Sequence, residues 1–188
     1  RPRAGGGRGG LVTATARLPD GLALTDPSLF RQANLVDGAW VQAADGAVIE
    51  VSDPATGEII GHVPSLSVEE VRGAIAAAYR AQNAWRALTG KERAAHLRRL
   101  FELMMANQED LARIMTAEQG KPLAEARGEV AYAASFIEWF GEEAKRVYGD
   151  VVPQNVAGRR SIVQKEPVGV FAAIKPLNFP AAMIPPKA

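Results

Sequence analysis

The chain has 188 residues, with 22 basic and 21 acidic side chains and therefore a formal net charge of +1. Apolar residues make up 47% and charged residues 23%, which is typical of a globular protein and excludes a disordered chain or a nucleic-acid binder that relies on bulk positive charge. Cysteine is absent, so this chain holds no disulfide, no thiolate metal site and no cysteine nucleophile.

The first 26 residues differ in composition from the rest. Residues 1–10 contain only arginine, proline, alanine and glycine and show no apolar periodicity, so we expect residues 1–26 to be a disordered Gly/Arg-rich segment. No acidic residue precedes Asp20, as in a mitochondrial transit peptide, but the amphipathic pattern of such a peptide is missing. The first methionine is Met104, so we expect the chain to be processed or part of a longer product.

Short strands are predicted between residues 35 and 64. Asp37 and Gly38 lie between apolar flanks, as in a two-residue hairpin turn. Two further apolar runs, at 48–51 and 59–63, are separated by the turn-forming sequence Asp53-Pro-Ala-Thr-Gly57.

Four amphipathic helices are predicted to follow. Ser67-Val-Glu-Glu70 and Thr89-Gly-Lys-Glu92 are capping boxes, which predict one helix over 67–87 and a second from residue 89. Asn107 is the predicted N-terminal cap of a third helix, and Gly120 marks its predicted end. A fourth helix is predicted over about 123–147. We interpret the apolar stripes of these helices as buried faces. The stripes contain Val71, Ala74, Ala78, Trp85, Leu97, Leu100, Phe101, Met104, Leu111, Ile114, Met115, Val130, Ala134, Ile137, Phe140 and Ala144.

Two more strands are predicted after the helices. Residues 160–166 fit a half-exposed strand. Residues 168–174 are continuously apolar, which is typical of a strand covered on both faces of a parallel sheet. Because Pro180 stands where a helix can begin, the end of the chain indicates the first strand–loop–helix unit of an α/β sheet. We therefore expect the chain to be the front part of something larger.

Few residues have the spacing of a catalytic or metal site. His62 and His96 lie in different elements without a serine or carboxylate pattern, so we interpret both as structural or solvent-facing. Glu138, Glu142 and Glu143 fit a solvated helix face better than an acid–base pair. The tryptophans are not clustered with basic residues, and no apolar run reaches the roughly 18–20 residues that span a bilayer, so neither nucleic acid nor a membrane is an expected partner.

Residues 174–180 place a polar side chain at the carboxyl end of a predicted buried strand, where open α/β sheets bind ligands. The amide of Asn178 offers two N–H donors without a charge, which suits an oxyanion that forms only in a transition state. A plain loop or cap role for Asn178 is the alternative.

Several strings resemble the aldehyde dehydrogenase superfamily, in particular its NAD(P)-dependent succinate-semialdehyde dehydrogenase branch. They follow the family's order and spacing over residues 29–184. The strings are Leu29-Phe-Arg-Gln32, Ala84-Trp-Arg-Ala-Leu88, Lys91-Glu-Arg-Ala94, Asp110-Leu-Ala-Arg113, Glu118-Gln-Gly-Lys-Pro-Leu-Ala-Glu125, Tyr132-Ala-Ala-Ser-Phe-Ile-Glu-Trp-Phe140 and Asn178-Phe-Pro-Ala-Ala-Met-Ile184.

The resemblance implies an α/β fold of three parts: a Rossmann-like NAD(P) domain, a catalytic domain and a small β extension for oligomerisation. Residues 27–188 would form the incomplete N-terminal part of the cofactor domain, with the helices as a layer on it and the start of the β extension near residues 151–166. It also implies a small-molecule aldehyde substrate, a homo-oligomer (dimer or tetramer) for the complete protein, and the cytoplasm as compartment, with the mitochondrial matrix as alternative.

In the family, a cysteine thiolate attacks the aldehyde, a backbone N–H and an asparagine amide hold the oxyanion, hydride passes to NAD(P)+, and a glutamate-activated water hydrolyses the thioester. The asparagine aligns with Asn178. The loop that contacts NAD or NADP aligns with Ile174, Lys175, Pro176, Leu177 and Asn178. The family's cysteine, glutamate base and ribose-binding lysine lie beyond the position of Ala188, and no metal ligand is implied.

The resemblance predicts the N-terminal portion of an enzyme that oxidises succinate semialdehyde to succinate; the alternative is a non-catalytic truncated protein that associates with full-length subunits. Two departures leave the substrate open. The family usually has Thr-Pro-Trp-Asn where residues 175–178 are Lys-Pro-Leu-Asn, and the branch has Thr-Arg-Lys where residues 185–187 are Pro-Pro-Lys. The arginine missing at Pro186 is one that the branch directs at the substrate carboxylate.

Overall fold

The structure is a computed structural model, and it describes Pro19 and residues 21–184. The expectation of disorder for residues 1–18 and 20 therefore lies outside the described residues. Within the same predicted segment, the backbone N–H groups of Thr25 and Asp26 donate to the carboxylate of Asp110, at 2.9 and 2.7 Å. These two residues are thus held against a helix.

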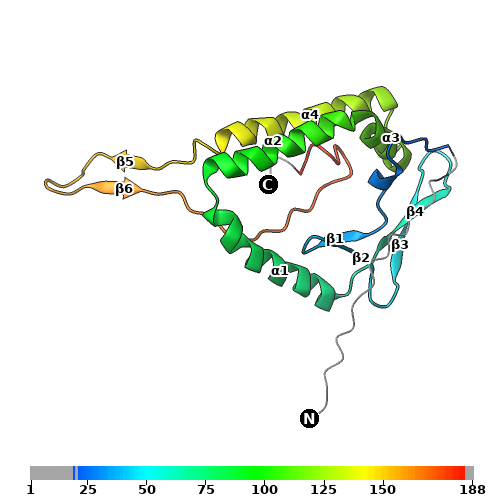
Figure 1. The fold of residues 1–188 in the computed structure, drawn as a ribbon, viewed down its shortest axis with the longest axis horizontal. Helices are drawn as coiled ribbons and strands as arrows, with labels where there is room; N and C mark the ends of the chain where they lie inside the picture. The colour runs from blue at the N-terminus through cyan, green and yellow to red at the C-terminus, as the bar shows by residue number, and fades with distance from the viewer. Residues whose placement is uncertain (1–18, 20, 185–188) are drawn as a thin grey trace, which may run out of the picture.

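Three antiparallel hairpins provide the strands of the described chain (Figure 1). Their strands are β1 Asn34–Val36, β2 Ala39–Val41, β3 Val48–Ser52, β4 Ile59–Pro64, β5 Asp150–Val152 and β6 Ser161–Val163. Asp37 and Gly38 both have positive φ, 50° and 77°, which is the type I′ turn that joins two twisted strands tightly. The Asp53–Gly57 turn closes with Gly57 N–H donating to Asp53 O at 2.7 Å. The predicted turn at Asp37-Gly38 and the predicted strands on either side of the Asp53–Gly57 turn are confirmed.

The helices begin and end largely where the sequence places them. They are the short 3₁₀ helix η1 Pro27–Leu29, α1 Val68–Ala87, α2 Gly90–Ala106, α3 Gln108–Gln119 and α4 Leu123–Glu143. Both predicted capping boxes are formed, at Ser67 with Glu70 and at Thr89 with Glu92. Gly120 ends α3 in the left-handed conformation, with φ 75°.

Two helix boundaries differ from the prediction. Asn107 makes no side-chain cap to α3; its Nδ2 donates instead to Leu103 O at 2.8 Å, because Asn107 also ends α2 and its φ/ψ of −109°/18° is not the extended backbone of a capping residue. Helix α4 ends at Glu143 rather than near Val147. At this end, Lys145 N–H and Arg146 N–H donate to the carbonyls of Glu142 and Glu143 in i→i+3 bonds, which replace the i→i+4 pattern of the helix.

The core lies where α4 packs along α2 and against α3 (Figure 1). One cluster of buried residues joins α3 and α4; it consists of Ala112, Met115, Ala126 and Val130, with Leu111, Leu123 and Ala181 packed on them. Small side chains allow the helices to approach closely. A Cβ added at Gly141 of α4 would lie 3.3 Å from Cβ of Leu97 on α2.

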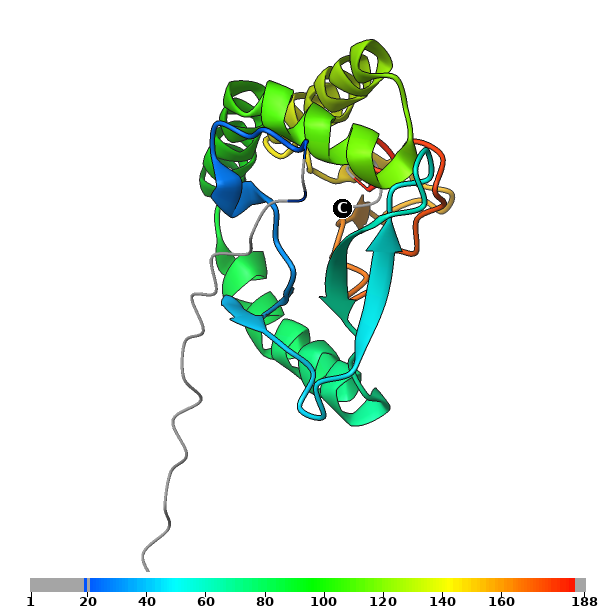
Figure 2. The same ribbon diagram turned by 90° about the vertical axis from the view of Figure 1, so that its right-hand side faces the viewer.

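Part of the predicted core is exposed. Val71 and Trp85 of α1 remain 45% and 46% exposed, and Ala78, Leu100 and Phe140 are also exposed, so their predicted burial is wrong in this structure. Helix α1 lies apart from the α2–α4 layer (Figures 1 and 2) and turns alanines, with Ala77 the buried one, toward the β1–β2 hairpin. Of its larger apolar side chains, Trp85 lies beside His96 of α2, whereas Val71, Ile75 and Tyr79 are exposed.

The predicted buried strand at 168–174 is not a strand in the structure. Val168 is 96% and Ile174 is 87% exposed. A parallel strand needs a neighbouring strand, but each of the three sheets in the described residues is an antiparallel pair that does not include residues 168–174. Pro180 does begin a single turn, in which Met183 N–H donates to Phe179 O at 3.1 Å.

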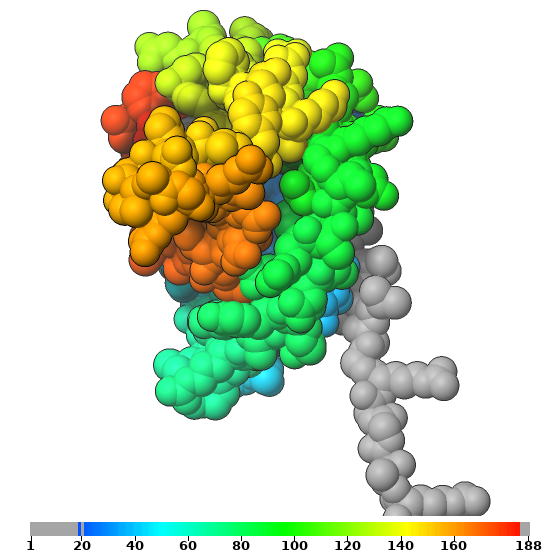
Figure 3. Space-filling view, turned by 90° about the vertical axis from the view of Figure 1, so that its left-hand side faces the viewer, coloured from blue at the N-terminus to red at the C-terminus, as the bar shows by residue number. Residues whose placement is uncertain are grey.

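The β5–β6 hairpin projects from the end of α4, away from the helices (Figure 1). It lies in the segment near residues 151–166 for which the start of the extension is predicted, and β6 lies inside the strand expected at 160–166. Figure 3 faces this end of the molecule and shows the hairpin in the foreground, with α1 and α4 behind it. Its strand residues are exposed on both faces.

Candidate functional site

The loop that carries Asn178 is docked on the junction of α3 and α4. Before Asn178, the carbonyl of Leu177 accepts from Gln119 Nε2 at 2.7 Å. After it, the Nζ atom of Lys121 lies 4.4 Å from the centroid of the Phe179 ring. These contacts hold the loop on both sides of Asn178, whose own side chain is exposed.

A buried glutamate anchors the turn that follows. Oε1 of Glu129 accepts from the N–H groups of Ala181, at 2.8 Å, and Ala182, at 3.4 Å. Its Oε2 accepts from Nζ of Lys121 at 2.5 Å. The side chains of Glu129 and Lys121 are only 1% and 11% exposed. A carboxylate this deeply buried is stable only with such partners, because burial removes its hydration.

Local structure explains why these side chains meet. Gln119 is the last residue of α3, and the left-handed Gly120 turns the chain so that Lys121 precedes α4. Glu129 belongs to the buried face of α4, between Ala126 and Val130. The Asn178 loop therefore contacts three polar side chains that the helix junction has already brought together.

Phe179 adopts φ 53°, which is unusual for a residue other than glycine. Such a conformation costs about 1–2 kcal/mol and persists where neighbouring contacts fix it. Here the fixing contacts are the Lys121 charge on the ring and the Glu129 carboxylate on the following turn. The strained residue directly follows Asn178.

The five residues expected to contact the cofactor stay together on this loop. Ile174 is 87% and Leu177 is 69% exposed, and Lys175, Pro176 and Asn178 are also exposed. The structure thus presents a cation and apolar side chains on one accessible segment. Pro185 and Pro186, at which this chain differs from the sequence of the branch, lie outside the described residues.

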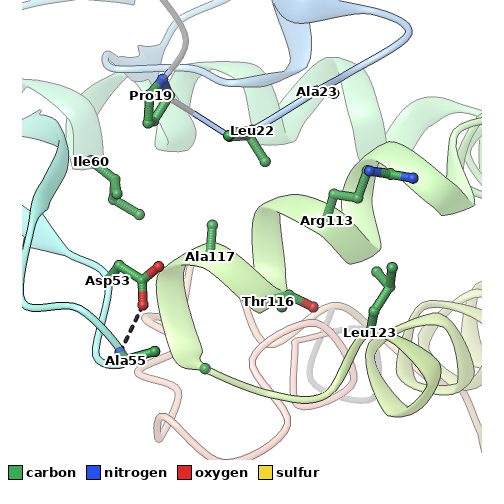
Figure 4. Close-up of a pocket in the computed structure, with 12 residues that line it drawn as sticks. Pro19, Leu22, Ala23, Asp53, Ala55, Ile60, Arg113, Thr116, Ala117 and Leu123 are labelled. Atoms are coloured by element: carbon green, nitrogen blue, oxygen red, sulfur yellow. Dashed lines mark hydrogen bonds between the residues drawn. The ribbon is translucent and has the colours of Figure 1, made fainter.

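A separate pocket of about 390 Å³ opens between the start of the described chain, the β3–β4 turn and the end of α3 (Figure 4). It is lined by Pro19, Gly21, Leu22, Ala23, Asp53, Ala55, Ile60, Arg113, Thr116, Ala117, Gly120 and Leu123. Its charged groups already have partners: Asp53 Oδ1 accepts from Ala55 N at 2.7 Å, and Arg113 Nε donates to Glu109 at 2.9 Å. We assign no chemistry to this pocket.

The other residues weighed from the sequence behave as surface groups. His62 and His96 are exposed, as expected, and His96 lies beside Trp85 with ring centroids 5.6 Å apart. Glu138 pairs with Arg98 across the α2–α4 surface at 3.3 Å. Among the described residues, no three His, Asp or Glu side chains gather as a metal site, and no helix there has the length and apolarity to cross a membrane.

Sequence reasoning missed Glu129, Lys121 and Gln119. One signal was available for Glu129. It lies three residues after Ala126 and directly before Val130, so a charged residue falls on the apolar stripe of its helix. A charge on a buried face must find partners, but the sequence does not say which ones.

The sequence profile of the aldehyde dehydrogenase family matches residues 40–188. The chain belongs to the aldehyde dehydrogenase family. This confirms the resemblance seen in the sequence strings, and the helices and strands of the described residues agree with the N-terminal part of that α/β fold.

Relatives within the family include semialdehyde dehydrogenases. The chain is 64% identical over 167 residues to a glutarate-semialdehyde dehydrogenase of Pseudomonas aeruginosa and 59% identical over 167 residues to an NADP(+) succinate-semialdehyde dehydrogenase of Escherichia coli. Each match covers 89% of this chain and 35% of the relative. The chain thus spans about a third of the length of these relatives.

Solved structures give the same result. The aldehyde dehydrogenase from Brucella melitensis biovar abortus matches with a TM-score of 0.86 and 61% identity, covering 88% of this chain and 34% of that one. The succinate-semialdehyde dehydrogenase from Burkholderia pseudomallei matches with a TM-score of 0.84, 57% identity and the same coverage. The roles of Asn178 and of residues 174–177 are not tested by these matches and stay predictions.

Proposed function

We propose that this chain is the N-terminal part of an NAD(P)+-dependent enzyme that oxidises a small aldehyde bearing a carboxylate. Succinate semialdehyde is the expected substrate, and its homologue glutarate semialdehyde is a second one. The observation that supports this is the 64% and 59% identity to dehydrogenases of these two semialdehydes over 167 residues.

In this proposal the amide of Asn178 donates to the oxyanion that forms when a nucleophile adds to the aldehyde. A neutral donor on an exposed but anchored loop suits this task, because it needs no counter-ion before the charge develops. The nucleophile is the family's cysteine thiolate. This chain contains no cysteine, so the thiolate must come from the remainder of the family's length.

Residues 174–178 would contact the cofactor. Exposed Ile174 and Leu177 offer apolar surface to a flat ring, and Lys175 offers a cation to phosphate, so the loop fits a dinucleotide. When bound, NAD or NADP accepts the hydride that the substrate carbon releases. In this proposal, this chain positions the Asn178 amide and forms one edge of the cofactor site.

The complete protein is proposed to be a dimer or tetramer of identical subunits. The β5–β6 hairpin supports this, since Val151 and Ile162 are 77% and 70% exposed on a projecting two-stranded sheet. The cytoplasm remains the expected compartment, with the mitochondrial matrix as the alternative.

The test is a chimera in which residues 21–184 replace the matching segment of the Pseudomonas aeruginosa relative. The chimera should oxidise glutarate and succinate semialdehyde with NAD(P)+. Asn178→Ala should lower kcat about 100-fold, the loss seen when an oxyanion donor is removed. Asn155→Ala, an exposed asparagine in the β5–β6 loop, is the control and should leave kcat unchanged. An Asn178→Ala chimera with unchanged kcat would remove Asn178 from the mechanism.

A further inference from the structure

We propose that Glu129, through its ion pair with Lys121, is a positioning residue for the Asn178 amide. The inference rests on the proposed function, in which that amide binds the oxyanion. Glu129 has no place in the chemistry itself, because its carboxylate is buried and fully engaged inside the α3–α4 junction.

The contacts fall on either side of Asn178 along the chain. Gln119 holds the carbonyl of Leu177, the residue before it. Lys121 holds the ring of Phe179, the residue after it, and Glu129 holds the N–H groups of residues 181 and 182. Within the described residues the side-chain amide of Asn178 has no hydrogen-bond partner, so its donors are available to a ligand.

The loop has no regular structure that would fix Asn178 otherwise. Residues 164–176 lie outside any helix or strand, and only one turn follows. An oxyanion donor must be held within about 0.5 Å of its productive position to act. The rigidity must therefore come from the helix junction beneath the loop, and Glu129 is its most deeply buried polar contact with the loop.

The charged pair supports the loop in two ways. Lys121 connects Glu129 to Phe179, so one charge network holds both the strained φ of 53° and the turn after it. Glu129 also accepts two N–H groups at the start of that turn, where backbone donors lack intrahelical partners. Replacing Glu129 by Gln keeps an acceptor for the turn but removes the charge that orients Lys121.

The first experiment measures amide hydrogen exchange in the 188-residue chain. Glu129→Gln should speed exchange at Ala181 and Ala182 by about tenfold, since a bond to a charged acceptor becomes a weaker neutral one. Glu125→Gln, an exposed glutamate one turn earlier on α4, is the matched control and should leave both amides unchanged. Unchanged exchange in Glu129→Gln would overturn the proposal, whatever the enzyme's activity.

The second experiment is a double-mutant cycle in the chimera described above. Glu129→Gln should lower kcat about tenfold and change KM less than about threefold, because the oxyanion exists only after substrate has bound. In the Asn178→Ala background the same substitution should cost no further kcat, since the amide that it positions is gone. An equal loss in both backgrounds would show a purely structural role and overturn the proposal.

If Glu129→Gln fails to fold in the chimera, Gln119→Ala replaces it in the cycle, because Gln119 Nε2 donates to the Leu177 carbonyl directly before Asn178. It should lower kcat only when Asn178 is present. Asn178→Ala with unchanged kcat would remove Asn178 from the proposed mechanism, a result that the exchange experiment does not depend on.

Discussion

At the residue scale, the carboxylate of Asp110 joins the start of the described chain to α3. Its two oxygens accept separately from Thr25 and Asp26 N–H, and these bonds lower the pKa of Asp110 below its ordinary value. The residue is 3% exposed. A side chain with two acceptors is required here, because both N–H groups point at it.

Asp110→Asn should therefore destabilise the chain by about 1 kcal/mol, since an amide has one acceptor oxygen and leaves one part-buried N–H without its partner. Urea unfolding measures the loss, and exchange at Thr25 and Asp26 should become faster. The control is Asp150→Asn on exposed β5, which should change little. Equal stability of the two variants would argue against this anchoring role.

Glu109, on the same helix, should make the stability of the chain depend on pH. A hydrogen bond from Arg127 Nε, at 2.6 Å, and a second from Arg113 lower its pKa from 4.5 to about 2. A lowered pKa means that the stabilisation is complete above pH 4.5 and is lost as pH falls toward 2.

The free energy of unfolding, measured between pH 4.5 and 2, should decrease as the pH decreases. Glu109→Gln should make this decrease less steep. Arg127→Gln removes the main hydrogen-bond donor and should have the same effect. If neither variant changes the pH dependence, Glu109 does not contribute to it.

At the element scale, two glycines of α4 differ in the space around them, because one of them faces α2. A Cβ at Gly141 would crowd Leu97, whereas a Cβ at Gly128 of the same helix would meet nothing within 4 Å. Gly128→Ala should raise the free energy of unfolding by about 0.5–1 kcal/mol through helix propensity. Gly141→Val should lower it by about 1–3 kcal/mol by overpacking. Thermal unfolding of both variants gives the comparison, and a stabilising Gly141→Val would contradict the close packing.

Helices α1 and α4 should differ in local stability. Helix α1 has the better N-terminal cap, but Ala77 is its buried residue, while α4 buries seven. Local opening follows burial more than capping, so amides in the middle of α1 should exchange faster than those from Val130 to Ile137. Hydrogen exchange by mass spectrometry resolves the two segments. Similar protection would mean that the cap governs α1.

At the scale of the whole molecule, the 188-residue chain alone should not oxidise aldehydes. The covalent adduct that allows hydride to leave needs a thiolate, and the chain has no cysteine. Oxyanion stabilisation by Asn178 has no effect without a nucleophile to generate the charge. The assay is NAD(P)H formation from succinate semialdehyde with repurified chain. Turnover above the blank would require a different mechanism.

Local chemistry made much of the fold predictable. The Asp37-Gly38 turn, the two capping boxes and the Gly120 helix end each depend on residues within a few positions of one another, and the structure has all of them. Family membership was also contained in the sequence, because it rests on strings spread from residue 29 to 184. Asn178 was singled out the same way, as a polar residue after an apolar run.

Burial and partnership were decided only by the tertiary structure. The apolar run at 168–174 indicated a buried strand, yet it pairs with no strand among the described residues. Helix α1 leaves Val71 and Trp85 exposed, although Trp85 lies beside His96. The support for Asn178 comes from Glu129, which is 49 positions away (178 − 129). Periodicity tells which face of a helix is apolar, but the partner of that face depends on where distant segments lie, and this is why the Glu129–Lys121 contacts with the loop appear only in three dimensions.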